Sequence, residues 1–310
     1  MAAVWQVGPR PGDLGFAAAL RQAQDGDEIL IAPGHYPGQV AVIHQRQLSI
    51  VGSGARPVFS ADGQSAEGKA IWVVRDGDIR IRNIEFRGAR VPDGNGAGIR
   101  FQRGRLHISD CRFIDNQMGL LTADEADSVL HIERSEFSHA PENPGTLAHL
   151  LYVGRMAEFS LRHSHLHHGR EGHLLKSRAA VSTITDNLID DGPEGQASYE
   201  IDLPNGGQAL VERNTIGQSA QTQNEVMLSF GAEGKPWPHS ALTLRDNSFI
   251  NRRGPRGVFV RVWSARLPAA ATVTSRGNRW LGGGGLQWGS TVNASGDRRG
   301  ALPAAAPARR

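Results

Sequence analysis

The chain has 310 residues, including 38 glycines and one cysteine, with 34 basic and 31 acidic side chains and a formal net charge of +3. One cysteine excludes a disulfide-stapled scaffold and a Cys-rich metal or iron–sulfur site. The near-neutral charge, without a concentrated Lys/Arg block, argues against a nucleic-acid-binding surface. No apolar stretch reaches the ~18 residues that a membrane-spanning helix needs. High glycine content with only 6% aromatic residues favours a turn-rich, all-β or repeat architecture.

The first predicted element is a short helix in an N-terminal segment that covers residues 1–24. Asp13 stands where an N-cap residue would start a helix over residues 16–23, and Phe16, Ala19 and Leu20 share its apolar face. A repeat protein leaves the core of its first unit open unless a terminal element covers it. We therefore expect this helix to cap the fold that begins at residue 25.

From residue 25 onward, a six-residue pattern recurs: an apolar residue, two polar ones, a small or amide residue, a variable one and a large apolar one. Its copies are residues 81–86, 108–113, 132–137, 161–166, 184–189, 211–216, 244–249 and 275–280. Short strands at one coil per ~25 residues are typical of a β-helix. The pattern predicts an all-β fold, a single-stranded parallel β-helix over residues 25–290, followed by a disordered tail over residues 291–310.

One position of the repeat forms a column of small and amide residues. In chain order the column contains Ile84, Cys111, Ser135, Ser164, Asn187, Asn214, Asn247 and Asn278. Inside a coil, a polar side chain is tolerated only if it is hydrogen-bonded. We therefore predict an asparagine ladder whose amides bond one another. Cys111 is interpreted as a buried packing residue of this column, not as a catalytic thiol.

A second set of strands lies between these copies, at residues 98–101, 149–153, 173–177, 199–203, 226–230 and 258–262. Alternate residues of a strand face opposite sides of a sheet, and neighbouring coils lie ~4.8 Å apart. With Leu151 and Leu175 pointing inward, one outward column consists of Tyr152, Lys176, Asp202 and Ser229. The next outward column consists of Leu150, Leu174, Glu200 and Met227.

The first of these columns is the predicted active site. His149 and His173 stand at the beginnings of its strands, and the residues beyond the strand ends are Arg155, Arg178, Asn205 and Glu233. β-Elimination from a uronate needs a base, groups that neutralise the carboxylate and an acid for the leaving oxygen. Lys176 or a histidine suits the base, and Tyr152 suits the acid. Arg178 and Arg155 suit the neutralising groups. The residues expected to bind substrate are His149, Arg155, Glu200, Asn205 and Glu233. The alternative reading of the row is a solvated Lys–Asp ion pair, which contributes little stability.

The coils from residue 25 to residue 280 resemble the right-handed parallel β-helix superfamily of pectate lyases and polygalacturonases. Residues 171–177, with the sequence EGHLLKS, resemble the strand ending in Lys-Ser of the chondroitinase B and alginate lyase family. This resemblance implies that Lys176 is the base, that an arginine assists it and that calcium neutralises the uronate. The family's Arg-His-Gly on the following coil is replaced by residues 203–206, LPNG, so Arg178 is the nearest substitute. The chain as a whole resembles uncharacterised bacterial β-helix-repeat proteins most.

These observations predict a monomeric polysaccharide lyase, secreted or periplasmic, that acts on an acidic polysaccharide, with calcium as the one cofactor to consider. Two alternatives stay open: a hydrolase or uronate C5-epimerase in the same groove, with Glu200 and Asp202 as a carboxylate pair, and a non-catalytic glycan-binding protein. A cluster of histidines at His163, His165, His167 and His168 offers no complete set of metal ligands by spacing. We interpret it as a polar face of the coil.

Overall fold

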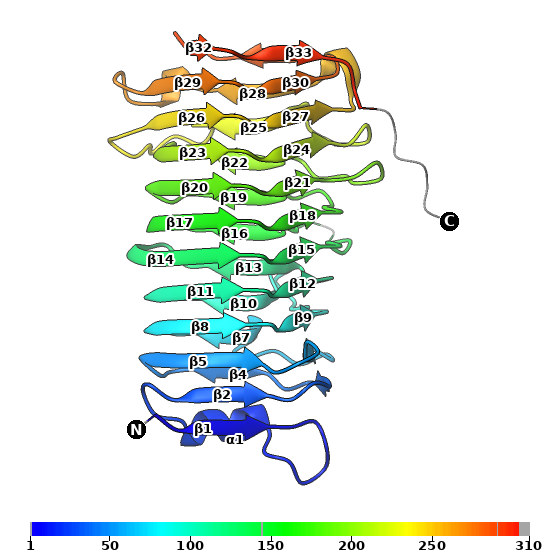
Figure 1. The fold of residues 1–310 in the computed structure, drawn as a ribbon, viewed down its shortest axis with the longest axis vertical. Helices are drawn as coiled ribbons and strands as arrows, with labels where there is room; N and C mark the ends of the chain where they lie inside the picture. The colour runs from blue at the N-terminus through cyan, green and yellow to red at the C-terminus, as the bar shows by residue number, and fades with distance from the viewer. Residues whose placement is uncertain (1, 144, 290, 304–310) are drawn as a thin grey trace.

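The computed structural model describes residues 2–143, 145–289 and 291–303. It confirms the all-β parallel β-helix: the chain winds through three parallel sheets, and each strand pairs with the corresponding strand of the next coil (Figure 1). We name the sheets A, B and C in the order in which each coil visits them. The short strands and the bends between them follow the two sets of repeats in the sequence.

The strand bounds define the sheets. Sheet A contains β1 (Val4–Val7), β2 (Glu28–Ile31), β5 (Gln47–Gly52), β8 (Asp78–Arg82), β11 (Arg105–Ser109), β14 (Glu125–Glu133), β17 (Met156–Arg162), β20 (Val181–Thr185), β23 (Gln208–Glu212), β26 (Ala241–Arg245), β29 (Thr272–Arg276) and β32 (Asn293–Ser295). Sheet B contains β3 (His35–Pro37), β6 (Val58–Ser60), β9 (Glu85–Arg87), β12 (Arg112–Ile114), β15 (Glu136–Ser138), β18 (His165–His167), β21 (Leu188–Asp190), β24 (Thr215–Gln218), β27 (Ser248–Asn251), β30 (Arg279–Leu281) and β33 (Arg298–Gly300). Sheet C contains β4 (Ala41–Ile43), β7 (Ala70–Val74), β10 (Ala97–Phe101), β13 (Met118–Thr122), β16 (Leu151–Val153), β19 (Leu175–Ser177), β22 (Ile201–Leu203), β25 (Val226–Phe230), β28 (Val258–Val262) and β31 (Gly285–Gln287). Two short 3₁₀ turns, η1 (Gly254–Arg256) and η2 (Ser264–Arg266), flank β28 among the described residues.

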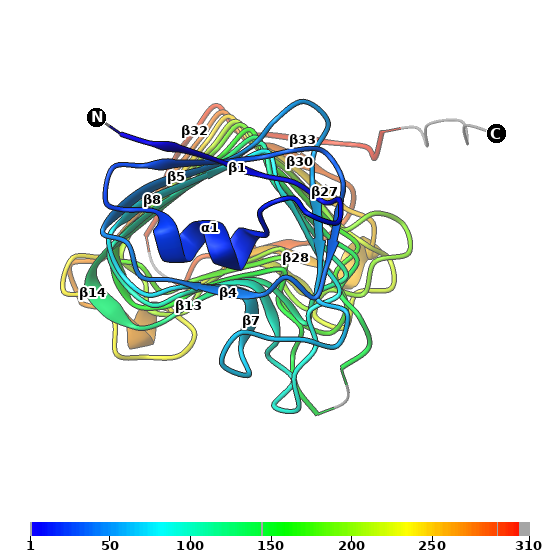
Figure 2. The same cartoon turned by 90° about the horizontal axis from the view of Figure 1, so that it is seen from below.

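The helix α1 (Phe16–Gln22) lies across the open end of the first coil (Figure 2). Phe16 is fully buried and stacks on Trp72 with ring centroids 4.2 Å apart, so the helix closes the core. Asp13 is not the N-cap residue, because the helix begins one residue after Gly15 and the Phe16 N–H donates to Gln39 Oε1 at 3.0 Å. The strand β1, which the sequence analysis did not anticipate, pairs with β2 beside this helix.

The coils continue beyond residue 290. β32 and β33 pair with β29 and β30, so residues 293–300, which the sequence analysis assigned to a disordered tail, belong to the last coil. The tail prediction failed there because the last coil keeps the pairing but loses the apolar pattern: β32 and β33 are exposed. Residues 304–310 of the predicted tail lie outside the described residues.

The asparagine ladder is confirmed. The Asn187 N–H and side-chain amide both donate to Asn214 Oδ1 at 2.9 Å, and the side-chain amide of Asn214 donates to Asn247 Oδ1 at 3.1 Å. The rungs Cys111, Ser135 and Ser164 continue the column, because each backbone N–H donates to the side chain one coil later. The residue before each rung takes a left-handed conformation, with φ between 46° and 59° at Asn83, Asp110, Arg134, His163, Asp186, Arg213 and Asp246. This one-residue bend turns the chain from sheet A into sheet B.

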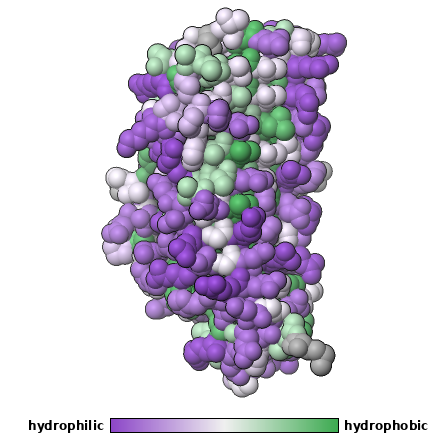
Figure 3. Space-filling view, turned by 90° about the vertical axis from the view of Figure 1, so that its left-hand side faces the viewer, coloured by the Kyte–Doolittle hydropathy of each residue, from purple (hydrophilic) through white to green (hydrophobic). Residues whose placement is uncertain are grey.

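The large apolar position of the repeat forms a second buried column in sheet B. Phe86, Phe113 and Phe137 stack face to face, with ring centroids 5.1 and 4.5 Å apart. Cys111 is 1% exposed beside them, and burial raises the pKa of its thiol to about 12, so it is a packing residue as predicted. The face shown in Figure 3 is mostly hydrophilic, with a narrow band of less polar side chains. Within the described residues, no helix combines the length and apolarity needed to cross a membrane.

Candidate functional site

The predicted outward column exists in the predicted register. Tyr152 on β16, Lys176 on β19, Asp202 on β22 and Ser229 on β25 are direct neighbours on successive coils of sheet C. Between them the inward positions are fully buried in the core, as at Leu151, Leu175, Ile201 and Leu228. Period-two alternation along each strand therefore places these four polar side chains on the outer face.

The centre of this column is an ion network. Lys176 Nζ lies 2.6 Å from Glu233 Oε1 and 3.6 Å from Asp202 Oδ2, and Arg178 pairs with the other oxygen of Glu233. Burial raises the pKa of Asp202 to about 6, against the opposing effect of Lys176. The cations of Lys176 and Arg178 hold the pKa of Glu233 below its usual range. The two carboxyl groups beside Lys176 thus differ in their readiness to accept a proton.

Arg178 connects this network to Tyr152. Its Nε donates to the Tyr152 hydroxyl at 2.9 Å, and its Nη1 donates to Asn205 Oδ1 at 2.8 Å. Lys176 Nζ and the Arg178 guanidinium lie 5.9 and 5.8 Å from the centre of the Tyr152 ring. A phenolic oxygen that gains negative charge would therefore be stabilised by one direct hydrogen bond and two nearby cations.

A loop over residues 231–240, between β25 and β26, covers the network. Trp237 Nε1 donates to the Arg178 carbonyl at 2.9 Å, and the Trp237 ring lies under the Arg155 guanidinium at 4.1 Å. Arg155 also donates to the Lys235 carbonyl at 2.9 Å. The predicted solvent exposure of the column is therefore wrong, since the side chains of Lys176 and Asp202 are 9% and 3% exposed. They point outward from the sheet, but the loop closes over them.

Two neutral histidines lie beside the column. The rings of His149 and His173 are buried with centroids 4.6 Å apart, and His173 Nε2 lies 3.5 Å from Asp202 Oδ2. Burial lowers the pKa of His149 to about 3, and burial together with His149 lowers the pKa of His173 well below its usual value. His149 Nδ1 accepts the backbone N–H of His173 at 2.8 Å, so the proton of the neutral ring is on Nε2. His149 is thus a hydrogen-bond donor.

These two histidines predict acid-sensitive folding. Their folded pKa values lie below the unfolded value of ~6.5, so their contribution is complete above that pH and is lost as the pH falls toward 3. The raised pKa of Asp202 acts in the opposite direction between pH 4 and 6. His149→Gln, whose amide oxygen can still accept the His173 N–H, should flatten the pH dependence of unfolding free energy by about 1 kcal/mol per pH unit. Urea unfolding between pH 4 and 7 tests this, and parallel profiles for both proteins would contradict it.

An open cleft of about 650 Å³ adjoins the network on the outer face of sheet C. Of the predicted site residues, Tyr152 and His149 line it. Its floor also contains Arg100, Leu121 and Thr122, and its rim contains Asp93, Asn95, Asp124 and Leu147. A substrate in this cleft would therefore meet Tyr152 and His149, while Lys176, His173, Arg178, Asp202 and Asn205 lie in the layer behind them.

Glu200 does not belong to this site. Its residue column also contains Leu150, Leu174 and Met227. The loops between sheets B and C bury this column, so it is not open to solvent. Glu200 is 0% exposed and neither carboxyl oxygen has a hydrogen-bond partner among the described residues. Burial raises its pKa well above the usual value. The prediction that Glu200 lies on an open outer face, where it would bind substrate or pair with Asp202, is therefore wrong.

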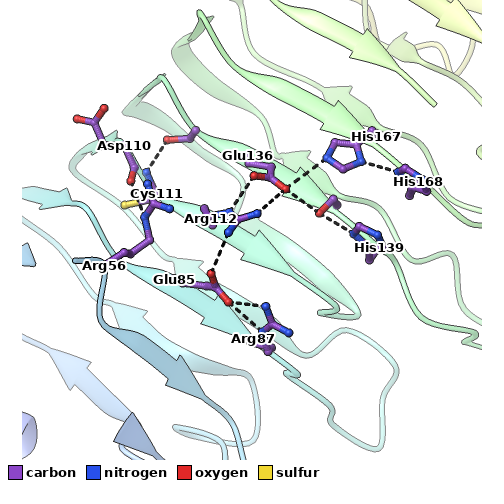
Figure 4. A network of polar contacts seen from close by, with 12 residues as sticks. Arg56, Glu85, Arg87, Asp110, Cys111, Arg112, Glu136, His139, His167 and His168 are labelled. Carbon is purple, nitrogen blue, oxygen red and sulfur yellow. Dashed lines mark hydrogen bonds and ion pairs between the residues drawn. The ribbon is translucent and has the colours of Figure 1, made fainter. Parts of the chain in front are cut away.

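Of the histidine cluster, His165 and His167 lie on the outer face of sheet B, and His167 and His168 belong to a polar network there (Figure 4). Arg112 pairs with Glu136 at 2.8 Å. His167, one coil after Glu136, places its Nε2 3.4 Å from the Glu136 carboxylate. Burial and the neighbouring His165 and His168 lower the pKa of His167 to about 4. Across the described residues, no group of three or more His, Cys, Asp and Glu side chains has the geometry to hold a metal ion. The polar-face interpretation accounts for these contacts.

A second hollow, of about 660 Å³, lies on the outer face of sheet A. Part of its polar lining is paired within the protein: His131 Nδ1 lies 2.7 Å from Ser160 Oγ, and Asp78 lies 3.8 Å from Arg80 and 3.6 Å from His107. None of the predicted site residues lines it. The cleft on sheet C is the better candidate because its polar groups converge on one tyrosine.

Two residues of the cleft region were missed from the sequence. Trp237 lies in a loop that no repeat places, so the sequence carried no signal for its position over Arg178. Arg100 did carry a signal: the strand at residues 98–101 belongs to the same set as the Tyr152 strand, and Arg100 occupies the outward column two coils earlier. Extending the column toward the N-terminus would have found it.

No family model and no curated protein sequence match the chain. Solved structures do match its fold. Pectate lyase Pel9A superposes with a TM-score of 0.63 over 96% of this chain and 78% of that chain, at 13% identity. An alginate lyase from Paenibacillus sp. str. FPU-7 superposes with a TM-score of 0.59 over 94% of this chain and 99% of that chain, at 14% identity. The chain has the pectate lyase-like right-handed parallel β-helix fold. At such low identity this likeness applies to the fold alone, and the function must be argued from the site.

Proposed function

We propose that the protein is a polysaccharide lyase that cleaves an acidic, uronate-containing chain by β-elimination in the sheet C cleft. The observation that carries this proposal is the Tyr152 hydroxyl, which lines the cleft while accepting a hydrogen bond from Arg178. A tyrosine so held can exchange a proton with substrate, and Arg178 and Lys176 lie where they can stabilise negative charge that develops on its oxygen during the transfer. The solved structures with the same fold, a pectate lyase and an alginate lyase, are consistent with this reaction class.

The reaction needs two proton transfers, one from C5 to the base and one to the glycosidic oxygen that leaves C4. The Tyr152 phenolate takes the proton from C5, α to the carboxylate, and the C5 electrons form the C4–C5 double bond. The bond from C4 to the glycosidic oxygen breaks, and the phenol returns its proton to that oxygen, which regenerates the phenolate. His149, whose Nε2–H is available, hydrogen-bonds the carboxylate as negative charge develops on it.

This assignment changes the roles expected from the sequence. Lys176 was the expected base, but it is paired with Glu233 and Asp202 under the loop. We therefore place it behind Tyr152, as a cation that positions the tyrosine and stabilises negative charge on its oxygen. Arg178 is in the same layer and contacts Tyr152 directly. Because polysaccharides of this kind lie outside the cytoplasm, the proposal also requires a secreted or periplasmic protein.

The test is a substrate panel. The protein is incubated with alginate, pectate, glucuronan and glycosaminoglycans, with and without calcium, and the absorbance of 4,5-unsaturated uronate is followed. We expect this absorbance to rise with at least one polymer. New reducing ends without absorbance would indicate a hydrolase, and a changed C5 configuration by NMR would indicate an epimerase. Either result, or no reaction with any polymer, would overturn the lyase proposal.

Calcium is tested in the same panel. The described residues contain no group of three or more His, Cys, Asp and Glu side chains that could hold a metal ion. Tyr152 and His149 supply proton transfer and carboxylate binding without a bound metal in this proposal. We therefore expect activity to persist in EDTA, and a strict calcium requirement would contradict the assignment of His149 to the carboxylate.

A further inference from the structure

Arg100 is an unpaired cation on the floor of the cleft. It lies on β10 in the outward column, and the inward residues on either side of it, Ile99 and Phe101, are fully buried. Within the described residues, its Nε is buried without a hydrogen-bond partner. Burial lowers the pKa of the guanidinium and the nearby Tyr152 and Asp124 act against it, but Asp124 forms no ion pair with Arg100 in the described part of the chain. A buried donor nearly always has a partner in a folded protein, so a donor without one on the floor of an open cleft is a candidate contact for a bound ligand.

The contrast with the other arginines of this sheet supports this reading. Arg178 bonds Tyr152, Asn205 and Glu233. Arg261, which occupies the same outward column beyond Ser229, pairs with Glu225 at 2.6 Å. Of these three arginines, only Arg100 lines the cleft. It is also the only one of the three that forms no ion pair with a described carboxylate.

We infer that Arg100 forms a carboxylate-binding subsite for a second uronate of the same chain, at a distance from the bond that is cleaved. This inference rests on the proposed function for the identity of the ligand. Arg100 lies two coils from Tyr152, a separation of ~10 Å along the helix axis. A guanidinium presents two parallel N–H groups that match a carboxylate, and it stays charged at any relevant pH.

The rest of the cleft suits a sugar chain between Arg100 and Tyr152. Leu121 lies between them on the floor, and Met118 and the half-exposed Leu147 add apolar surface for sugar ring faces. Asp93 and Asp124 are exposed on the rim, where they oppose the binding of an anion. Their charges are screened by solvent, whereas the Arg100 guanidinium is partly buried and less screened. The Arg100 guanidinium on the floor therefore favours acidic over esterified sugars. The carboxylates on the rim lower the affinity for acidic sugars.

The experiment measures binding separately from cleavage. Isothermal titration with acidic oligouronates, and with the same oligomers fully methyl-esterified, is done on the Tyr152→Phe background so that turnover is slow during the measurement. Arg100→Gln should weaken binding of the acidic oligomer by about 10- to 100-fold and leave the ester unchanged. Asp93→Asn, which removes a rim charge, should strengthen acidic binding a few-fold. Arg261→Gln, in the same column outside the cleft, is the matched control and should bind like its parent.

The outcomes separate this inference from the proposed function. Cleavage of a polymer by the wild type, with the same KM in Arg100→Gln, would overturn the subsite and leave the lyase proposal standing. Arg100-dependent binding without cleavage of any polymer would overturn the lyase proposal and leave a carboxylate-selective glycan site. Arg100→Lys, which keeps the charge but not the paired donors, guards against a folding defect and should recover part of the affinity. Equal loss for acidic and esterified oligomers would overturn the carboxylate assignment.

Discussion

Tyr152→Phe is expected to lower kcat on the responsive polymer by about 10²- to 10⁴-fold, with little change in KM. The substitution removes one oxygen, which is the only group of the cleft that both faces substrate and bonds Arg178. The ring keeps its packing, since Tyr152 is half-buried against Met118 and Leu121. The variant should therefore fold normally and bind substrate normally. The measurement is the steady-state rate of unsaturated uronate formation.

The chain offers a matched control for this prediction. Tyr199 lies outside the cleft and packs edge-on against His173, with ring centroids 4.7 Å apart. Tyr199→Phe removes the same atom from the same neighbourhood and should retain most of the activity. Lys176→Met provides the competing arm, because it deletes the base that the family resemblance implies. If Lys176→Met abolished turnover while Tyr152→Phe retained it, the proton would be transferred by Lys176 and our assignment would be wrong.

The sequence predicted the fold because a β-helix repeats its constraints on every coil. The inward column from Asn187 to Asn278 and the outward column from Tyr152 to Ser229 are both in the expected register, since strand alternation and parallel stacking leave no other solution. Where the repeat weakens, so did the prediction. β1 and β32 pair with their neighbours without the apolar pattern that marks the inner coils.

The register of the candidate column was predicted from the sequence, but the burial of its side chains was not. Strand register can bring Lys176, Tyr152 and Asp202 together, yet it says nothing of a loop that folds over them. The loop at residues 231–240 has no repeat and no partner in the pattern, so its Trp237 and Glu233 contacts with Arg178 could not be placed. The burial of Glu200 was missed for the same reason, because the repeat does not predict loop structure. Strand alternation predicts that this side chain faces outward, but the loops between sheets B and C bury it. Loops that cross several coils decide what is open to a substrate.

Asn214→Ala is expected to cost about 3–5 kcal/mol of unfolding free energy. Asn214 Oδ1 accepts two hydrogen bonds from Asn187, and its Nδ2 donates to the Ile184 carbonyl at 2.8 Å and to Asn247 Oδ1. Alanine leaves several of these buried groups without partners, each at ~1–3 kcal/mol, and it also leaves a cavity. Urea denaturation measures the loss.

Asn214→Ser is the informative control because serine already serves as a rung of the same column. Ser164 Oγ accepts the Ser135 N–H at 3.1 Å, so a serine at residue 214 can still satisfy the Asn187 backbone. It should therefore recover part of the stability lost in Asn214→Ala, although it cannot reach the Ile184 carbonyl and Asn247 together. A β-helix coil is stabilised mainly through its two neighbours, so the damage should spread from this coil to the adjacent ones. Equal stability of the alanine and serine variants would mean that the ladder's hydrogen bonds contribute little, and that packing of the flanking columns holds the coils in register.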